Sequence, residues 1–408
     1  MSQLPPLACT TFINPAHQRD AAYGPRRSEI LNATALAQAE KVITAWPGYR
    51  VTPLHALRQL AGRLGVASVH YKDEGSRFGL GSFKALGGAY AVSQLLCREL
   101  GRRLGRALTT ADLLQPDVRA ACSSITVTCA TDGNHGRSVA WGAQLFGCRC
   151  VIYIHATVSE GRRQAIAHYG ATVVRTAGNY DDAVRQADHD AHAIGRFVIS
   201  DTSYPGYMDV PRDVMQGYQL MVNEAVNQLG SWPTHVFVQA GVGGFAAAVC
   251  AWFWERDAAR RPCFVVVEPT RADCLMQSAR RGEITAVTGE LDTLMAGLAC
   301  GEVSLLAWEI LAQGADAFCT IDDEAAVAVM RLLARPQGND PAIVAGESAV
   351  AGLAAAMGVL NDPAACAALG IDASSRFLFF GSEGDTDPAL YRQLVGATAQ
   401  DVLAGRAA

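Results

Sequence analysis

The segment Gly81–Tyr90, GSFKALGGAY, places one lysine among small and apolar residues. The chain has 34 Lys and Arg residues, of which only Lys41, Lys72 and Lys84 are lysines. Arginine stays protonated, whereas a lysine in an apolar setting can become a neutral amine, which is a nucleophile toward a carbonyl group. A lysine whose ammonium simply reaches solvent is the alternative. Because the chain uses arginine almost everywhere else, Lys84 is a candidate for Schiff-base chemistry.

Three other segments place glycines or polar residues directly after an apolar run. In Thr131–Gly136, TDGNHG, four polar side chains are interleaved with two glycines, which exceeds what capping of a following helix requires. In Gly241–Gly244, GVGG, backbone N–H groups at the start of a helix are suited to a phosphate, although close packing of helix and strand needs the same glycines. The segment Gly381–Gly384, GSEG, is by itself only a strand exit.

Metal and disulfide sites have weaker support in the sequence. His189 and His192 are three residues apart, but a solvated helix face explains that spacing better than a metal site does, and we predict no metal. Cys274 and Cys300 could pair, yet sequence alone does not show proximity, and we interpret them as unpaired thiols.

The composition indicates a large globular protein with a small-molecule ligand. With 408 residues, 50% hydrophobic and 18% charged, the chain is long enough for two or three domains. A net charge of −5 with scattered arginines argues against a nucleic-acid partner. No apolar run approaches the roughly 20 residues of a membrane helix. The N-terminus shows no secretory signal, and with twelve cysteines this predicts reduced thiols in the cytoplasm.

The elements that must position these residues alternate between strand and helix. Strands are predicted at Ser68–Tyr71, Ile125–Ala130, Cys150–Ile154, Thr172–Thr176, Arg196–Ser200, His235–Gln239, Cys263–Val267, Ala317–Ile321 and Phe377–Phe380. Helices are predicted at Asn32–Ala45, Lys84–Gly101, Arg137–Gly147, Glu160–Tyr169, Asp181–Ile194, Val210–Leu229 and Ala345–Leu360. Strands joined by helix-length connections predict an α/β fold with mostly parallel sheets flanked by helices, in two sheets rather than one.

Together these pieces resemble the fold-type II pyridoxal-phosphate enzymes, the superfamily of tryptophan synthase β and threonine dehydratase. In that superfamily a G-S-x-K segment carries the Schiff-base lysine, an asparagine loop follows a later strand, and a glycine-rich loop binds the cofactor phosphate. The chain is more closely similar to the diaminopropionate ammonia-lyase family. That similarity spans Trp46 to Asp387 through the segments WPGY, YKDEGSRFGLGSFKALGGAYA, TDGNHGRSVAWGAQ, NYDDAV, DTSYPGY, QAGVGG, MAGLACGE, GNDP, GES and SEGDTD.

The resemblance implies a role for each matching residue toward pyridoxal 5′-phosphate. Lys84 would form the Schiff base, Asn134 would hydrogen-bond the phenolic oxygen, and Ser382 would face the pyridine nitrogen. The phosphate would be held by four consecutive residues, Gly241, Val242, Gly243 and Gly244.

The resemblance also implies β-elimination of 2,3-diaminopropionate to pyruvate and two ammonia molecules. Thr131 would lie near the substrate carboxylate. Asp132 would take the α-proton of the D-isomer, with Lys84 serving the L-isomer. Asp201 would bind the β-ammonium that leaves.

The same resemblance implies an architecture. Residues 87–227 would form a small substrate-closing domain, and residues 1–86 and 228–408 would form a large cofactor-binding domain. Cofactor would lie in the cleft, and the enzyme would be a homodimer.

Two other functions remain open at the level of the sequence. A serine/threonine or 3-hydroxy amino acid dehydratase would use the same fold and the same lysine but release hydroxide. A non-catalytic nucleotide-binding or regulatory protein would use the glycine loop alone.

Overall fold

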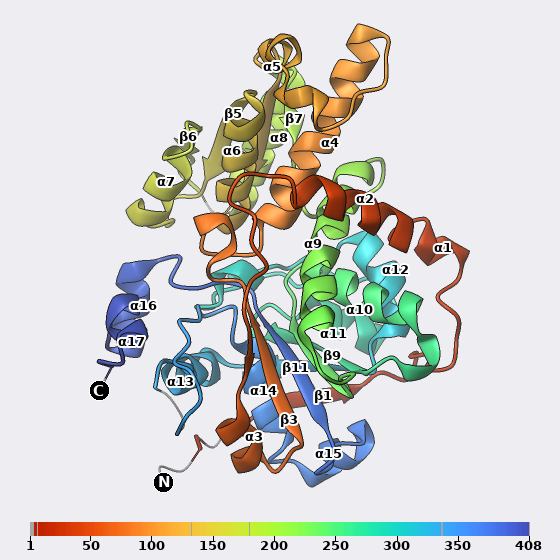
Figure 1. The fold of residues 1–408 in the computed structure, drawn as a ribbon, viewed down its shortest axis with the longest axis vertical. Helices are drawn as coiled ribbons and strands as arrows, with labels where there is room; N and C mark the ends of the chain where they lie inside the picture. Colours follow the sequence, from red (N-terminus) through yellow and green to blue (C-terminus); the bar gives the residue numbers. More distant parts are fainter. Residues whose placement is uncertain (1–3, 6, 132, 179, 336–337, 408) are drawn as a thin grey trace. The chain divides into compact units, whose positions relative to one another are not determined.

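The computed structural model describes residues 4–5, 7–131, 133–178, 180–335 and 338–407 of the chain. These residues form two compact units (Figure 1). Unit 1 comprises Met1–Ala33, Val51–Ser76 and Met221–Ala408, and unit 2 comprises Thr34–Arg50 and Arg77–Leu220.

Unit 1 is built on a seven-stranded sheet with the strand order β1-β10-β9-β8-β11-β3-β2. Its strands are β1 (Thr10–Ile13), β2 (Leu54–Ala56), β3 (Ser68–Asp73), β8 (His235–Gln239), β9 (Cys263–Pro269), β10 (Ala317–Ile321) and β11 (Arg376–Gly381). The five inner strands are parallel, and the two edge strands β1 and β2 run antiparallel to their neighbours. Inner strands such as β8 are buried along their whole length, as expected for a sheet covered on both faces.

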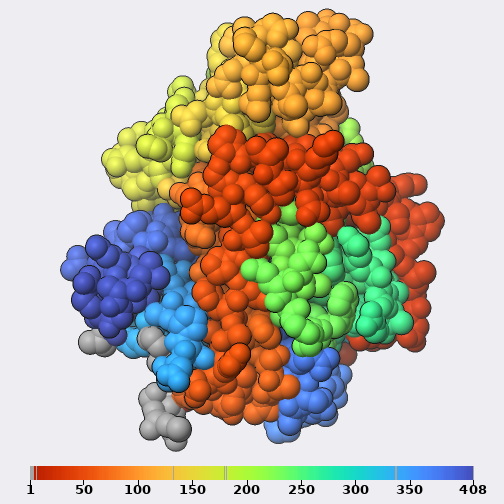
Figure 2. Space-filling view, viewed as in Figure 1, coloured from red at the N-terminus to blue at the C-terminus, as the bar shows by residue number. Residues whose placement is uncertain are grey.

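The helices of unit 1 cover this sheet. They are α1 (Pro25–Ser28), α3 (Arg58–Leu64), α10 (Gly244–Arg256), α11 (Cys274–Arg281), α12 (Leu305–Gly314), α13 (Asp323–Ala334), α14 (Ala351–Val359), α15 (Pro363–Leu369), α16 (Pro388–Val395) and α17 (Ala399–Leu403). Short α16 and α17 lie on the surface, where α16 packs against α13 (Figure 2).

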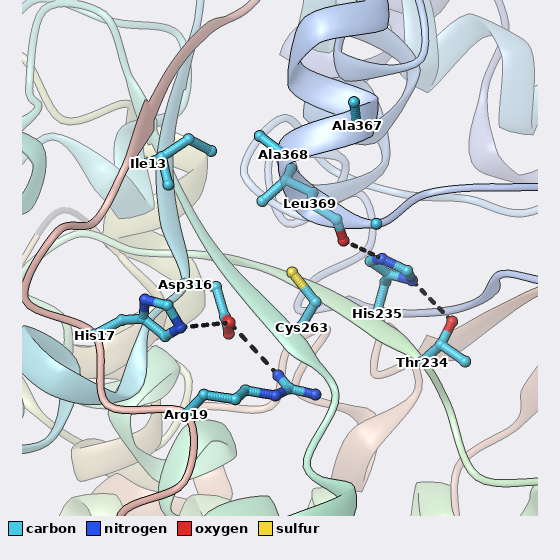
Figure 3. A pocket seen from close by; sticks show the side chains of 11 residues that line it. Ile13, His17, Arg19, Thr234, His235, Cys263, Asp316, Ala367, Ala368 and Leu369 are labelled. Carbon is cyan, nitrogen blue, oxygen red and sulfur yellow. Dashed lines mark hydrogen bonds and ion pairs between the residues drawn. The ribbon is translucent and has the colours of Figure 1, made fainter.

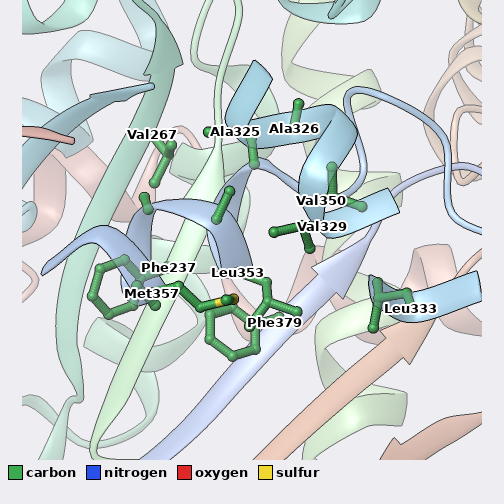
Figure 4. Packing of buried hydrophobic residues seen from close by; sticks show 14 of the residues in the cluster. Phe237, Val267, Ala325, Ala326, Val329, Leu333, Val350, Leu353, Met357 and Phe379 are labelled. Carbon is green, nitrogen blue, oxygen red and sulfur yellow. The ribbon is translucent and has the colours of Figure 1, made fainter. Parts of the chain in front are cut away.

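The core of unit 1 lies between α14, α13 and the inner strands (Figure 4). Leu353 and Met357 of α14 pack beside Phe237 of β8 and Phe379 of β11. All residues of α14 are buried, which fits a helix that is apolar on every side. A Cβ at Gly352 would lie 2.5 Å from the Phe237 carbonyl oxygen, so α14 rests directly on β8.

No single helix in the described part of the chain is long and apolar enough to cross a membrane. Helices α14 and α15 reach that length only as a pair, across a bend of 109°.

Unit 2 contains a four-stranded parallel sheet in the order β6-β5-β4-β7. Its strands are β4 (Thr126–Ala130), β5 (Arg149–Ile154), β6 (Thr172–Arg175) and β7 (Phe197–Val198). Its helices are α2 (Ala33–Ile43), α4 (Ala85–Leu104), α5 (Pro116–Cys122), α6 (Asn134–Phe146), α7 (Glu160–Ala167) and α8 (Tyr180–Ile194), and α9 (Asp209–Gln228) contributes residues to both units.

Helices α4 and α6 approach each other closely within unit 2. A Cβ at Gly88 would lie 2.0 Å from the Ser138 hydroxyl, and one at Gly142 would lie 2.8 Å from the Ala89 Cα. The two helices that carry Lys84 and Asn134 at their starts are therefore fixed against each other by contacts that leave no room for side chains.

The expected fold class and the expectation of two sheets are confirmed, and all nine predicted strands are present. Strands β1 and β2 were not predicted. The helix predicted from Ala345 begins at Ala351, because Gly346 and Ser348 donate their backbone N–H groups to Glu383 instead.

Candidate active site

Lys84 immediately precedes α4 in unit 2, and its ammonium meets a carboxylate. Lys84 Nζ lies 2.7 Å from Asp201 Oδ2, and the two side chains are 19% and 22% exposed. The rings of Phe83 and Tyr218 lie 5.5 and 5.8 Å from the same nitrogen. Two residues that are 117 positions apart in sequence thus form one mostly buried ion pair against aromatic rings.

The turn that leads into Lys84 has an unusual backbone. Phe78, Gly79 and Gly81 have φ angles of 52°, 71° and 75°, in the left-handed region that a phenylalanine rarely adopts. The Phe78 ring packs 4.8 Å from Trp141 and 6.0 Å from Trp46, measured between ring centroids. This aromatic packing holds Phe78 in a conformation that its backbone alone would disfavour.

Asp201 follows β7 and stays anionic. Burial alone would raise its pKa, but the Lys84 ammonium, and to a lesser degree His135, hold the pKa well below its usual range. The carboxylate is therefore ionised while Lys84 carries its positive charge.

The segment after β4 supplies the start of α6. Thr131 is buried, and its hydroxyl oxygen accepts hydrogen bonds from the N–H groups of Gly133 and Gly136, at 3.0 and 3.1 Å. Asn134 is the first residue of α6 and is half-buried. Asp132, the predicted base for a D-substrate, lies outside the described residues.

His135 belongs to the same segment and was not predicted as a site residue. It is buried, and its Nδ1 lies 4.0 Å from Asp201 Oδ2. The residue was visible within TDGNHG, but its partner lies 66 positions further along the chain, so the pairing has no local signal.

In unit 1 the glycine loop joins β8 to α10. Gly243 has φ 96° and precedes Gly244, the first residue of α10, and as a glycine it has no side chain of its own to cap the helix. A Cβ at Gly241 would lie 2.8 Å from Cys300 Sγ, so the loop is pressed against its neighbours. Backbone N–H groups at such a helix start are suited to bind an anion.

Two cysteines lie against this loop, and a glutamate interacts with one of them. Cys274 and Cys300 form no disulfide in the described part of the chain, and Cys274 Sγ lies 3.8 Å from the Gly241 carbonyl oxygen. Burial raises the pKa of Glu268, at the end of β9, to about 8, although the Leu275 and Met276 N–H groups donate to its carboxyl group. A carboxyl group whose pKa is raised in this way carries less negative charge at neutral pH than an exposed glutamate does.

Ser382, directly after β11, is the other predicted cofactor residue of unit 1. Its buried hydroxyl oxygen accepts a hydrogen bond of 2.9 Å from Gln239 Nε2, which leaves the hydroxyl proton to be donated elsewhere. Gln239 Oε1 is buried and has no hydrogen-bond partner within the described parts of the chain. Gln239 was missed from the sequence, where it reads as the last residue of a strand.

Segments that carry the family resemblance converge beside Ser382. Gly297 donates its N–H to Ser348 Oγ at 3.2 Å, and Ser348 donates its own N–H to Glu383 at 3.1 Å. A Cβ at Gly346 would lie 2.6 Å from the Gly384 carbonyl oxygen. Tight packing of these loops therefore accounts for their glycines without a contact to any ligand.

The two remaining lysines have ordinary environments. Lys41 is exposed in the last turn of α2. Lys72 is fully buried, where its ammonium lies 2.8 Å from Glu224 Oε2 and donates to the Thr52 carbonyl oxygen at 2.8 Å. Lys84 therefore differs from both, because it is paired with a carboxylate and still partly accessible, whereas Lys41 is exposed and Lys72 is fully buried.

A cavity of about 430 Å³ lies at the amino ends of β8, β9 and β10 in the unit 1 sheet (Figure 3). Asp316 pairs there with His17 and Arg19, and His235 is bonded to the Leu369 carbonyl and to Thr234. The predicted cofactor residues of unit 1 all lie at the carboxyl ends of the strands, where ligands of parallel sheets bind. This cavity is therefore separate from them.

Comparison with known proteins identifies the family. Residues 45–370 match the model of the pyridoxal-phosphate dependent enzymes. A diaminopropionate ammonia-lyase of Salmonella typhimurium is 41% identical over 86% of this chain and 89% of its own. The Escherichia coli K12 enzyme of the same name is 41% identical over 85% of this chain and 88% of its own.

Solved structures agree with this assignment. Escherichia coli diaminopropionate ammonia lyase, in complex with an aminoacrylate–PLP azomethine reaction intermediate, superposes with a TM-score of 0.86 at 37% identity, covering 97% of this chain and 98% of the other. The apo form of the same enzyme gives a TM-score of 0.80 at 34% identity, covering 95% and 97%. The chain belongs to the pyridoxal-phosphate-dependent enzymes, and within them to the diaminopropionate ammonia-lyase family.

Proposed function

We propose that this enzyme releases ammonia from 2,3-diaminopropionate by β-elimination and yields pyruvate and a second ammonia. The observation that carries the proposal is the Asp201 carboxylate, held anionic 2.7 Å from Lys84 Nζ. A fixed negative charge beside the predicted reactive lysine favours a substrate that carries a second ammonium group, because opposite charges attract strongly at a partly buried site. The relatives at 41% identity bear the name of this activity.

The residues present fit pyridoxal phosphate. Lys84 would bind its aldehyde carbon, the Gly241–Gly244 loop its phosphate, Asn134 its phenolic oxygen and Ser382 its ring nitrogen. The glycine at the start of α10 and the available Ser382 proton support these assignments. When bound, the cofactor supplies an electron sink for the negative charge that develops at the substrate α-carbon.

Different side chains of the protein then remove the α-proton and bind the leaving group. Lys84 takes the α-proton of the L-isomer, and Asp132 takes that of the D-isomer. Asp201 binds the β-ammonium and orients it for departure as neutral ammonia. Thr131 lies near the substrate carboxylate, with its hydroxyl proton still available because its oxygen already accepts two N–H groups. The remaining unsaturated amino acid hydrolyses to pyruvate and the second ammonia.

Closure of residues 87–227 as a small domain and a homodimeric assembly are parts of the same proposal. Closure would exclude water from the reacting group.

Release of pyruvate from the D- and L-isomers of 2,3-diaminopropionate, serine, threonine and 3-hydroxyaspartate tests the proposal. We expect kcat/KM to be highest for diaminopropionate and to fall by about a hundredfold or more in Asp201→Asn, because removing one partner of a buried charge pair costs about 2–5 kcal/mol. Turnover of serine should fall less in the same variant, since its leaving hydroxyl carries no charge. A preference for a hydroxy amino acid would overturn the proposal.

A second variant in the same assay tests which residue removes the α-proton. Asp132→Asn should slow turnover of D-2,3-diaminopropionate more than that of the L-isomer. Equal losses on the two isomers would contradict the role of Asp132 as the D-specific base.

A dehydratase activity is the second candidate function. Escherichia coli diaminopropionate ammonia lyase has also been solved in complex with D-serine, and that structure has a TM-score of 0.85 to this chain at 36% identity. D-Serine is therefore the hydroxy amino acid to compare first.

A further inference from the structure

The ring of His135 has a fixed protonation pattern. Its Nε2 lies 2.7 Å from the Ile199 carbonyl oxygen. A carbonyl oxygen only accepts hydrogen bonds, so Nε2 carries the hydrogen, and in the neutral ring Nδ1 is a bare lone pair.

The bare Nδ1 faces the Lys84–Asp201 pair. Nδ1 is buried without a hydrogen-bond partner among the residues that the structure describes. It lies 4.0 Å from Asp201 Oδ2, which is the oxygen that Lys84 Nζ contacts at 2.7 Å. A lone pair that faces a carboxylate gains nothing, whereas a protonated Nδ1 would face it as an ion pair.

We propose that His135 holds the proton that Lys84 gives up when Lys84 becomes a neutral amine. The N–H bond at Lys84 Nζ breaks, the proton passes to Asp201 Oδ2, and it moves on to His135 Nδ1, where a new N–H bond forms. The imidazole becomes an imidazolium whose Nε2–H stays on the Ile199 carbonyl, and Asp201 returns to its anionic form. Only a proton moves, so Lys84 becomes neutral, His135 becomes positive, and the total charge of Lys84, Asp201 and His135 is unchanged.

The charges around His135 favour this transfer in the required order. Burial lowers the pKa of His135, Asp201 raises it, and the Lys84 ammonium lowers it further, so the ring is neutral while Lys84 is charged. Once Lys84 has lost its proton, its opposing charge is gone and the Asp201 carboxylate remains beside Nδ1.

No other described ionisable group near Asp201 competes for the proton. The other ionisable groups that interact electrostatically with this carboxylate are Cys129, Tyr207 and Tyr218. Burial raises the pKa of each, so all three stay protonated. Asp132 is the remaining ionisable residue of the segment and lies outside the described residues.

This role rests on the proposed function, because both attack on the cofactor carbonyl and removal of an α-proton need Lys84 as a free amine. His135 acts through Asp201 and is therefore a positioning residue rather than a catalytic one.

The first test is the pH profile of kcat/KM for L-2,3-diaminopropionate in His135→Gln. Glutamine can still donate to the Ile199 carbonyl but cannot hold a proton at the place of Nδ1. We expect activity near pH 7 to fall about tenfold, the rising limb of the profile to move up by about one pH unit, and most activity to return at high pH. His235→Gln is the matched control, since His235 is also buried and bonded through Nε2 to a backbone carbonyl, but lies in unit 1. A loss of the same factor at every pH would overturn the proposal.

The second test measures the protonation of His135 directly and does not depend on enzyme activity. In ¹³C-histidine-labelled protein, the His135 signal is the one missing from His135→Gln or His135→Asn. We expect Lys84→Gln to raise the pH at which this signal titrates by about one unit, because it removes the neighbouring positive charge. A titration that stays within about 0.3 unit of the wild type would overturn the proposal.

The two proposals can fail separately. An enzyme that prefers serine would contradict the proposed substrate and still show the coupling between Lys84 and His135. An enzyme that prefers diaminopropionate with no such coupling would leave the proposed function intact and refute the relay.

Discussion

The two units carry site residues of opposite chemical character. In unit 1 the proposed cofactor ligands are backbone N–H groups of Gly241–Gly244 and the hydroxyl of Ser382, and burial raises the pKa of Glu268 in β9 to about 8. In unit 2 the site also contains titratable side chains, with Lys84, Asp201 and His135 in one coupled group beside the neutral Thr131 and Asn134. Unit 1 offers fixed neutral donors, whereas unit 2 offers charges that can change.

This difference matches two separate tasks. Neutral donors bind an anionic group with no proton to gain or lose, so their strength does not vary with pH. Proton transfer requires groups whose charge state can change during the reaction. The comparison predicts that substitutions in the Gly241–Gly244 loop of unit 1 weaken cofactor binding. Substitutions in the charged group of unit 2 should instead lower kcat.

The largest expected effect belongs to unit 2. Lys84→Ala removes the amine, so the visible absorbance of a lysine Schiff base should disappear and turnover should fall at least about a thousandfold. Lys41→Ala is the control, because Lys41 is exposed on α2. Spectra and steady-state rates of the two variants measure the difference, and an unchanged spectrum in Lys84→Ala would refute the assignment.

A smaller effect is expected in unit 1, on binding alone. Gly243→Ala forces an alanine to φ 96° and places its Cβ 3.1 Å from the Ala307 Cβ. We expect Kd for pyridoxal phosphate to rise about tenfold to a hundredfold, which corresponds to about 1.4–2.8 kcal/mol of lost binding, with kcat at saturating cofactor changed much less. Absorbance titration of the cofactor-free protein gives Kd.

Gly282→Ala separates backbone strain from loop contact. Gly282 has φ 73° with no atom within 4 Å of its Cβ position, and it lies in the same unit. Gly282→Ala should lose about 1 kcal/mol of stability and bind the cofactor normally. Equal losses of cofactor affinity in both glycine variants would contradict the assignment of the loop.

The inner strands were predictable because burial on both faces gives continuous apolar runs. Strand β8, for example, was predicted with the bounds that the structure has. Strands β1 and β2 are short, half-buried and antiparallel, so neither forms a continuous apolar run. Strand β1 (TTFI) also contains two threonines. The register of the two strands depends on pairing with β10 and β3, which a local pattern does not contain.

The candidate site was predictable only where one residue type is chemically required. The scarcity of lysine singled out Lys84, yet Lys72 escaped the same bias for a structural reason, as a buried partner of Glu224. Asp201 was assigned through family resemblance, and its contact with Lys84 comes from the fold. His135 and Gln239 were missed because their importance lies in partners that are far away in sequence.

The smallest expected effect concerns the turn before Lys84, which determines how well unit 2 holds its charged group. Phe78→Leu removes the ring that packs on Trp46 and Trp141 and holds the left-handed backbone, so we expect a stability loss of about 1–2 kcal/mol. Because this turn carries Lys84, kcat should fall as well, by less than about tenfold. Phe146→Leu is the matched control, since Phe146 is buried, packs on the same Trp46 ring at 6.0 Å and lies in the regular helix α6. Thermal unfolding should show similar losses in the two variants, while kcat should fall only in Phe78→Leu. If both variants lost kcat equally, the aromatic cluster would act through general stability, and the strained turn would have no separate part in positioning Lys84.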